Sequence, residues 1–214
     1  MRGLMLVAFL GLALPLTLVG EDAKLPEGFV PLFNGKDIDN WKVLDGKKEV
    51  WGVEKGIIFC EKGGGGWLVT EKEYGNYELH IEYKLPKLGN SGVGLRFPMK
   101  GNPAYQGMEI QLIDDENWKG LQDYQHTGSV YDVIPAALQN NKPIGEWNAI
   151  DIVANGSKIL IKVNGKVTVD GDLAAHREKK GKDHPGILRE KGHIGLQSYN
   201  FRVEFKNVTI KELK

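Results

Sequence analysis

The chain has almost no cysteine and no excess of charge of either sign. Its single cysteine, Cys60, excludes an internal disulfide and the zinc sites that are built from cysteine pairs. The 28 basic and 28 acidic residues cancel, which argues against a dedicated nucleic-acid-binding protein, because such a protein carries a basic face. The chain has 214 residues, of which 41% are hydrophobic and 28 are glycines, so we expect one domain with a packed core and many turns.

The N-terminus has the pattern of a secretory signal peptide. Arg2 is followed by an apolar run over residues 4–19, which is short for a membrane span. Gly20 suits a cleavage site, whereas Leu18 is large for its position, so an uncleaved anchor is the alternative. We expect a signal peptide at 1–20, a short tail at 21–27 and one domain at 28–214. The mature protein is then periplasmic or extracellular, without stable membrane association after cleavage.

The rest of the chain is dominated by alternation of apolar and polar residues. In residues 77–85 the odd positions are apolar and the even positions polar, which predicts a strand with one buried face. Residues 108–112 and 201–205 alternate in the same way. The apolar parity then changes to Val208 and Ile210, which predicts a bulge near Lys206 and Asn207.

Turn signals connect these strands. Two Asn-Gly pairs, at 155–156 and 164–165, predict a three-stranded meander over 147–154, 157–163 and 166–170. A turn at 54–56 joins two further short strands. Roughly a dozen such segments predict an all-β fold, a two-sheet antiparallel sandwich. The charged segment 172–191 departs from this pattern and is expected to be a solvated loop with one helical turn near 173–179.

Glu109 and Gln111 are the strongest candidate site residues. They lie on one strand face, opposite the apolar Met108, Ile110 and Leu112. A carboxylate and an amide lining a groove suit the hydroxyl groups of a sugar, although a glutamate on the wet face of a strand is more often only solvated. Asp114, five residues after Glu109, is too far along a straight strand to form a glycosidase carboxylate pair with it, so we place Asp114 at the groove edge.

Four more residues are candidates from the pattern alone. Arg96 shares strand parity with Gly92 and Gly94, which predicts open space around its guanidinium on the groove floor; a salt bridge to a neighbouring strand is the alternative. Trp67 and Tyr105 can stack on sugar rings, although buried packing is the commoner fate of an aromatic residue. His126 is the one catalytic histidine candidate, with an ordinary loop position equally open.

Several motifs in consistent order resemble the DUF1080 family, also called the 3-keto-disaccharide hydrolase domain. The resemblance covers about residues 28–213 and is specific as a set. After Leu196-Gln197 many members have a His-Gly stretch, whereas this chain has Ser198-Tyr199. The motifs are Gly28-Phe29-Val30-Pro31-Leu32-Phe33-Asn34-Gly35-Lys36-Asp37 with Trp41, Gly66-Trp67-Leu68-Val69-Thr70, Tyr74-Gly75-Asn76-Tyr77-Glu78-Leu79, Asn90-Ser91-Gly92-Val93-Gly94-Leu95-Arg96, Glu109-Ile110-Gln111-Leu112-Ile113-Asp114, Thr127-Gly128-Ser129-Val130-Tyr131, Gly145-Glu146-Trp147-Asn148 and Gly192-His193-Ile194-Gly195-Leu196-Gln197.

The resemblance implies a concanavalin-like jelly roll that acts on 3-keto glycosides, sugars already oxidised at the 3-hydroxyl by a partner oxidoreductase. A 3-keto group acidifies the hydrogen on C2, so one base and one acid suffice for elimination, followed by hydration. The expected catalytic residues are Glu109, Asp114 and His126. The expected substrate-binding residues are Arg96, Gln111, Trp67, Tyr105, Tyr131 and Gln197, with Arg96 stabilising the enolate oxygen.

Three classes of function remain open from the sequence. The first is an enzyme that cleaves keto-glycosides, the second is a non-catalytic carbohydrate-binding module that uses the same groove, and the third is a structural surface domain. The clustered carboxylate, amide and arginine favour the first two. No cofactor is predicted; the acidic run 114–116 leaves calcium possible, although it lacks a full ligand pattern.

Overall fold

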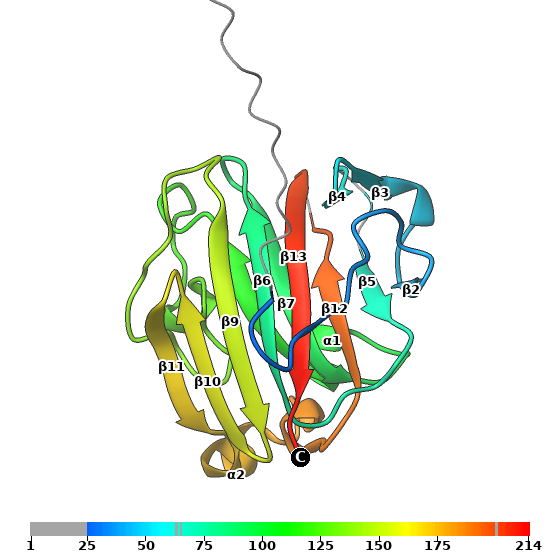
Figure 1. Ribbon diagram of the computed structural model, residues 1–214. Helices are drawn as coiled ribbons and strands as arrows, with labels where there is room; N and C mark the ends of the chain where they lie inside the picture. The colour runs from blue at the N-terminus through cyan, green and yellow to red at the C-terminus, as the bar shows by residue number, and fades with distance from the viewer. Residues whose placement is uncertain (1–24, 63, 65, 200) are drawn as a thin grey trace, which may run out of the picture.

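The protein is a sandwich of two antiparallel sheets, as the alternating sequence predicts (Figure 1). The computed structural model describes residues 25–62, 64, 66–199 and 201–214. The predicted signal peptide and most of the predicted tail therefore lie outside the described residues. Within the described ranges, no helix has the length and apolar character needed to cross a membrane.

The larger sheet contains eight strands among the described residues, and it confirms the predicted hairpins. Asn155 and Gly156 begin the first turn of the meander, and Asn164 and Gly165 form the second. The order is β11-β10-β9-β6-β13-β4-β3, with β1 beside β13. The bounds are β1 (Val30–Pro31), β3 (Trp51–Glu54), β4 (Ile57–Cys60), β6 (Tyr77–Lys84), β9 (Asn148–Asn155), β10 (Lys158–Val163), β11 (Lys166–Asp172) and β13 (Val203–Glu212).

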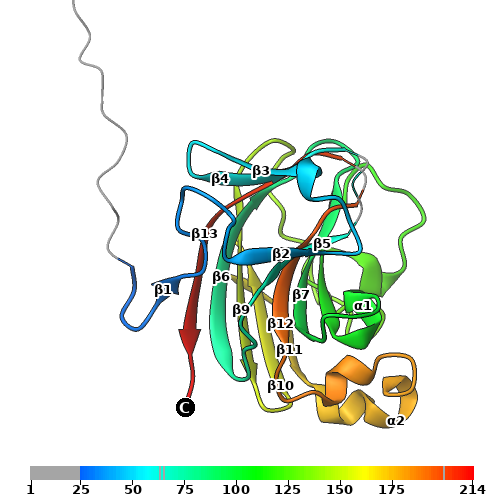
Figure 2. The same ribbon diagram turned by 90° about the vertical axis from the view of Figure 1, so that its right-hand side faces the viewer.

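In the part of the chain that the structure describes, the smaller sheet has five strands in the order β2-β5-β12-β7-β8. Figure 2 shows the two sheets nearly edge-on, with both short α-helices on the side of the smaller sheet. The strands are β2 (Trp41–Leu44), β5 (Trp67–Thr70), β7 (Asn90–Phe97), β8 (Met108–Ile113) and β12 (His193–Gln197). The α-helices are α1 (Pro103–Gln106) and α2 (Arg177–Lys180), and 3-10 turns cover Lys48–Val50 (η1), Asp123–Gln125 (η2), Leu173–His176 (η3) and Pro185–Leu188 (η4).

The core fills the space between the sheets, and the alternating residues supply it. In β6, Leu79, Ile81 and Tyr83 are buried. In β8, Ile110 and Leu112 point into the same cluster. Cys60 is a free, buried cysteine within this core, as expected of a small apolar residue.

The predicted bulge in β13 is present. The pairing register between β13 and β6 shifts between Lys206 and Thr209, and Asn207 has a φ of 50°. Asparagine tolerates this left-handed conformation better than most residues. The bulge moves Val208 and Ile210 onto the buried face, which explains the change of parity in the sequence.

A second bulge, in β7, corrects the prediction for Arg96. The pairing with β12 shifts between His193 and Gly195, and Arg96 has a φ of 51°. The side chain of Arg96 leaves the face of Gly94, and the ring of Phe97 takes that space: a Cβ on Gly94 would lie 2.7 Å from it and 2.9 Å from Trp67. The expected open space around the guanidinium is therefore filled by aromatic rings.

The charged segment 172–191 is more ordered than a solvated loop. The helical turn predicted near 173–179 is present as η3 and α2. The segment also packs against the domain, because His184 is only 1% exposed and a Cβ on Gly186 would lie 1.9 Å from the carbonyl oxygen of Gly107. The run of charges correctly marks an exposed α2 but gives no sign that η4 packs against α1.

Candidate functional site

A polar pocket of about 280 Å³ lies over the outer face of the smaller sheet. Its floor comes from β7, β8 and β12, and its walls come from α1 and the long segment 114–131. The lining residues are Asn90, Asn102, Ala104, Tyr105, Glu109, Gln111, Ile113, Trp118, Leu121, Gln125, Tyr131, Gln197 and Tyr199.

Glu109 is the one carboxyl group among these lining residues. It is 4% exposed, and a Cβ on Gly92 would come within 2.1 Å of its Oε1 atom, so the glycine is what lets the side chain lie across β7. Burial raises the pKa of Glu109 to about 8, although a hydrogen bond with Gln197 acts in the opposite direction. A carboxyl group with such a pKa can accept or donate a proton near neutral pH.

The stability of the protein should therefore fall as the pH rises. A carboxyl group with a raised pKa binds its proton more tightly in the folded state, so its contribution is complete below about pH 4.5 and is lost as the pH passes about 8. We expect this to lower the free energy of unfolding by on the order of 3–5 kcal/mol across that window. In Glu109→Gln this component is absent, and denaturant unfolding at pH 5 and pH 9 measures the difference. Equal pH dependence in both proteins would contradict the raised pKa.

Amide groups surround the carboxyl group. Gln111 is 3% exposed, and its Nε2 donates to Asn90 Oδ1 over 3.2 Å. Gln197 lies at the end of β12 beside Glu109. The arrangement supplies fixed donors and acceptors of the kind that sugar hydroxyl groups require.

Three tyrosines complete the pocket: Tyr105, Tyr131 and Tyr199. Segment 128–131 pairs with the free edge of β8, where Tyr131 N donates to Glu109 O over 2.8 Å and Gln111 N donates to Ser129 O over 3.1 Å. Tyr105 comes from α1 and is 40% exposed. Partial burial and the nearby Tyr131, Asp132 and Glu109 raise the pKa of Tyr105. The phenol of Tyr105 therefore keeps its proton next to Glu109.

Of the residues predicted from the sequence, the pocket brings together Glu109, Gln111, Tyr105, Tyr131 and Gln197. It does not contain Arg96, which donates to the carbonyl oxygens of Gly75, Gly156 and Arg189 and to Asn76 Oδ1. Trp67 is also elsewhere: it is 4% exposed and packs against Phe97, with 6.0 Å between ring centroids.

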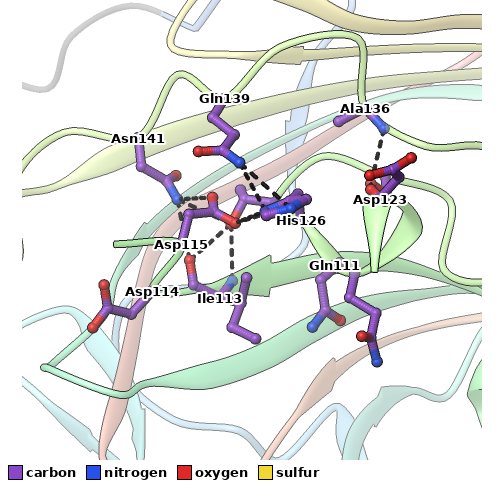
Figure 3. Close-up of polar contacts among 12 residues, drawn as sticks. Gln111, Ile113, Asp114, Asp115, Asp123, His126, Ala136, Gln139 and Asn141 are labelled. Atoms are coloured by element: carbon purple, nitrogen blue, oxygen red, sulfur yellow. Dashed lines mark hydrogen bonds and ion pairs between the residues drawn. The ribbon is translucent and has the colours of Figure 1, made fainter. Parts of the chain in front are cut away.

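Asp114 and His126 are likewise not among the lining residues. Asp114 is 2% exposed and caps a turn, where its carboxylate accepts hydrogen bonds from Leu88 N and Asn117 N. His126 Nδ1 lies 2.9 Å from Asp115 Oδ1, with the Gln139 side chain beside it. Figure 3 shows this cluster and shows Asp114 pointing away from Gln111. The expectation that Asp114 lies at the edge of the groove is corrected, because the turn after β8 directs it elsewhere.

The acidic run 114–116 is not part of a cluster of three or more carboxylate, imidazole or thiol groups in the part of the chain that the structure describes. Across residues 25–62, 64, 66–199 and 201–214, no group of three or more His, Cys, Asp or Glu side chains is arranged to hold a metal ion. Asp115 is instead bound by protein donors, since Thr127 N and Asn141 Nδ2 both donate to its carboxylate.

Sequence reasoning missed several lining residues: Asn90, Asn102, Trp118, Gln125 and Tyr199. Asn90 shares strand parity with Gly92, so the alternation contains a signal for it. Trp118 and Gln125 come from the irregular segment between β8 and β9, where no periodicity indicates which side chains turn inward. Tyr199 lies two residues after Gln197, beyond the end of β12.

Three larger pockets among the described residues are less suitable. One of about 500 Å³ is lined by Asp123, His126 and residues 135–139, and its carboxyl group, Asp123, is exposed. Another of about 430 Å³ is lined by Asp114, Asp115, Glu116 and Lys142, among others, and both Asp114 and Asp115 are held by internal hydrogen bonds. Another of about 670 Å³ lies on the outer face of the larger sheet and is mainly apolar, with Phe29 and Phe33 in its lining. The pocket around Glu109 is the one that combines a buried carboxyl group, amides and tyrosines.

The protein is thus a two-sheet jelly-roll sandwich with a polar pocket on the outer face of its smaller sheet. The chain belongs to the family of the 3-keto-alpha-glucoside-1,2-lyase-like domain, whose model matches residues 28–211.

Known proteins agree with this assignment. A 3-keto-disaccharide hydrolase of Bacteroides thetaiotaomicron is 28% identical over an alignment of 230 positions, gaps included. The alignment covers 87% of this chain and 79% of that protein. A crystal structure from Parabacteroides distasonis, named with the glycosyl hydrolases, has a TM-score of 0.77 and 30% identity, and the match covers 88% of this chain and 95% of that one. The carbohydrate binding module CBM66 of Bacillus subtilis, at 12% identity and a TM-score of 0.54, shares the fold alone. The family and these relatives support a glycoside hydrolase-like function.

Proposed function

We propose that this protein cleaves 3-keto glycosides by elimination across C1 and C2, followed by addition of water. The observation that carries this proposal is that Glu109 is the one carboxyl group among the described residues that line the pocket. An ordinary glycosidase needs two carboxyl groups about 5–10 Å apart. Elimination needs one base, because the 3-keto group already acidifies the hydrogen on C2.

In this reaction the carboxylate of Glu109 removes the hydrogen from C2. The electron pair of the C–H bond forms an enolate between C2 and C3, and its collapse restores the C3 carbonyl, forms the C1–C2 double bond and breaks the bond to the aglycone oxygen. Water then adds its oxygen to C1 and a proton to C2. Since the base form of Glu109 is needed, kcat/KM should rise with pH up to about 8.

The test is incubation with a 3-keto glucoside or 3-keto-trehalose, with release of free sugar as the measurement. The matching glycoside with an intact 3-hydroxyl serves as the control and should remain uncleaved, because its C2 hydrogen is not acidic. Binding of the keto-glycoside without any release of sugar would instead identify a carbohydrate-binding module.

The substrate requires a partner that oxidises the 3-hydroxyl of a glycoside, so we also propose a sugar 3-oxidoreductase as the functional partner. We place both activities outside the cytoplasm, on the strength of the apolar run over residues 4–19. Intact-mass analysis of the secreted protein tests this location and should show loss of about the first 20 residues. Recovery only in the membrane fraction, with Met1 retained, would instead point to an uncleaved anchor.

A further inference from the structure

The elimination needs an acid as well as a base. The residues that line the pocket limit which side chains can act as that acid. None of the described lining residues is a lysine, arginine or histidine. Apart from the carboxyl group of Glu109, the lining side chains that carry a transferable proton are the phenols of Tyr105, Tyr131 and Tyr199, because amide and indole N–H groups donate hydrogen bonds without giving up the proton.

The surroundings of Tyr131 single it out among the three. Gln125 Nε2 donates to the phenol oxygen of Tyr131 over 3.5 Å, and Tyr131 contributes to the raised pKa of the nearby Tyr105. The phenol oxygen of Tyr131 accepts in this bond from Gln125, so its own proton is free for a ligand. The backbone of Tyr131 is also fixed to β8 beside Glu109, by the bond from its N–H to Glu109 O.

Asp132, the residue after Tyr131, is held in place by contacts with Lys180 and His184. Asp132 has a φ of 56°, which is strained for a residue with a side chain. Its carboxylate lies 2.9 Å from His184 Nε2 and 2.8 Å from Lys180 Nζ. Burial acts against the ionised form, yet the bonds with Lys180 and His184 keep the pKa of Asp132 below its ordinary value.

His184, a member of this cluster, also contacts Tyr105. The imidazole of His184 is almost fully buried, and its ring centroid lies 5.1 Å from that of Tyr105. Arg189 Nε also donates to Gln106 O at the end of α1. The segment 180–189 therefore contacts both α1, which carries Tyr105, and the turn after Tyr131.

We propose that Tyr131 is the acid that protonates the departing glycosidic oxygen, and that the cluster of Asp132, Lys180 and His184 positions it. This inference rests on the proposed function. As the bond from C1 to the aglycone oxygen breaks, the oxygen takes the phenol proton of Tyr131 and leaves as an alcohol. The phenolate that remains is stabilised by the donor from Gln125, and water restores its proton.

The test of the acid is the dependence of Tyr131→Phe on the leaving group. For a methyl 3-keto glucoside, whose aglycone leaves poorly without a proton, we expect kcat to fall by roughly 10²–10³-fold. For a nitrophenyl 3-keto glucoside the loss should be less than about tenfold, since that aglycone leaves as a stable anion. Tyr124→Phe is the matched control, because Tyr124 packs against Tyr131 but does not line the pocket.

A second measurement separates the acid from the base. In heavy water, Tyr131→Phe should still exchange the C2 hydrogen of unreacted substrate for deuterium, whereas Glu109→Gln should not. Equal losses with both aglycones, or loss of the exchange in Tyr131→Phe, would overturn the assignment, as would full activity of that variant. Failure of the wild-type protein to cleave either substrate would instead reject the proposed function.

The positioning role is tested by a double-mutant cycle. Asp132→Asn should lower kcat for the methyl substrate by about tenfold, with little change in KM, and Lys180→Met should have a smaller effect in the same direction. In the Tyr131→Phe background Asp132→Asn should have almost no further effect on kcat, because the group that it positions is gone. Additive losses would show that the cluster acts on folding and not through Tyr131.

Discussion

Replacing Glu109 by Gln is expected to lower kcat for a 3-keto glycoside by roughly 10²–10⁴-fold, because the amide cannot take the proton from C2. Glutamine keeps the shape of the side chain and its hydrogen bonds with the neighbouring amides, so KM should change little. Steady-state kinetics with a 3-keto glucoside measure both quantities. Glu78→Gln is the matched control: Glu78 lies on β6 of the opposite sheet, in an ion pair with Lys211, and its replacement should leave kcat unchanged.

The proposed elimination also predicts incorporation of deuterium at C2 when the reaction runs in heavy water. When the wild-type protein works in heavy water, the added deuteron should appear at C2 of the released keto sugar, and a sample of that sugar without protein corrects for spontaneous exchange. Retention of the original hydrogen at C2 would rule out elimination and favour direct displacement at C1. Full activity of Glu109→Gln would mean that the base is another group.

The alternation of apolar and polar residues was sufficient to predict the sheets and the centre of the site. In β8 it places Glu109 and Gln111 on one face and the core residues Ile110 and Leu112 on the other. Period-two patterns determine a face wherever a strand continues without interruption. The two Asn-Gly turns were equally informative, since few other sequences suit that turn type.

The same pattern failed at Arg96 for a physical reason. The bulge in β13 is visible in the sequence, because the apolar residues change parity around Asn207. The bulge in β7 is not visible, because Phe97 is apolar and can be buried on either face of the sheet. The odd positions from Val93 to Phe97 therefore read as one continuous strand, and the side chain of Arg96 was assigned to the wrong side.

The other pocket residues that the alternating pattern did not predict lie in or next to loops. Tyr131 and Gln197 were found through motifs of the family and not through periodicity, and Trp118 and Gln125 were not found at all. Their positions depend on long-range contacts, such as the bond from Tyr131 N to Glu109 O, that no local pattern encodes. The burial of His184 next to Asp132 is of the same kind: a charged segment gives no sign of which single residue turns inward.

The position of Arg96 leads to the second large expected effect, which concerns stability. Its guanidinium is 1% exposed and donates to three carbonyl oxygens and to Asn76 Oδ1, at distances from 2.7 to 3.3 Å. These acceptors belong to the segment before β6, the turn between β9 and β10, and the end of the charged segment. One side chain therefore joins three parts of the chain that are distant in sequence.

Arg96→Met should lower the free energy of unfolding by roughly 3–5 kcal/mol, because it removes the guanidinium donor from the three carbonyl oxygens; Asn76 Oδ1 still accepts from Gly156 N. Arg96→Lys keeps the charge but lacks the planar guanidinium group with its several donors, so we expect an intermediate loss of stability. Arg202→Met is the control: Arg202 is partly exposed and pairs with Glu61 and Glu204, and its loss should cost about 1 kcal/mol or less. Denaturant unfolding measures all three. The fraction of Arg96→Lys that folds should retain wild-type kcat, because Arg96 does not line the pocket; a fall in kcat with unchanged stability would instead return Arg96 to the catalytic site.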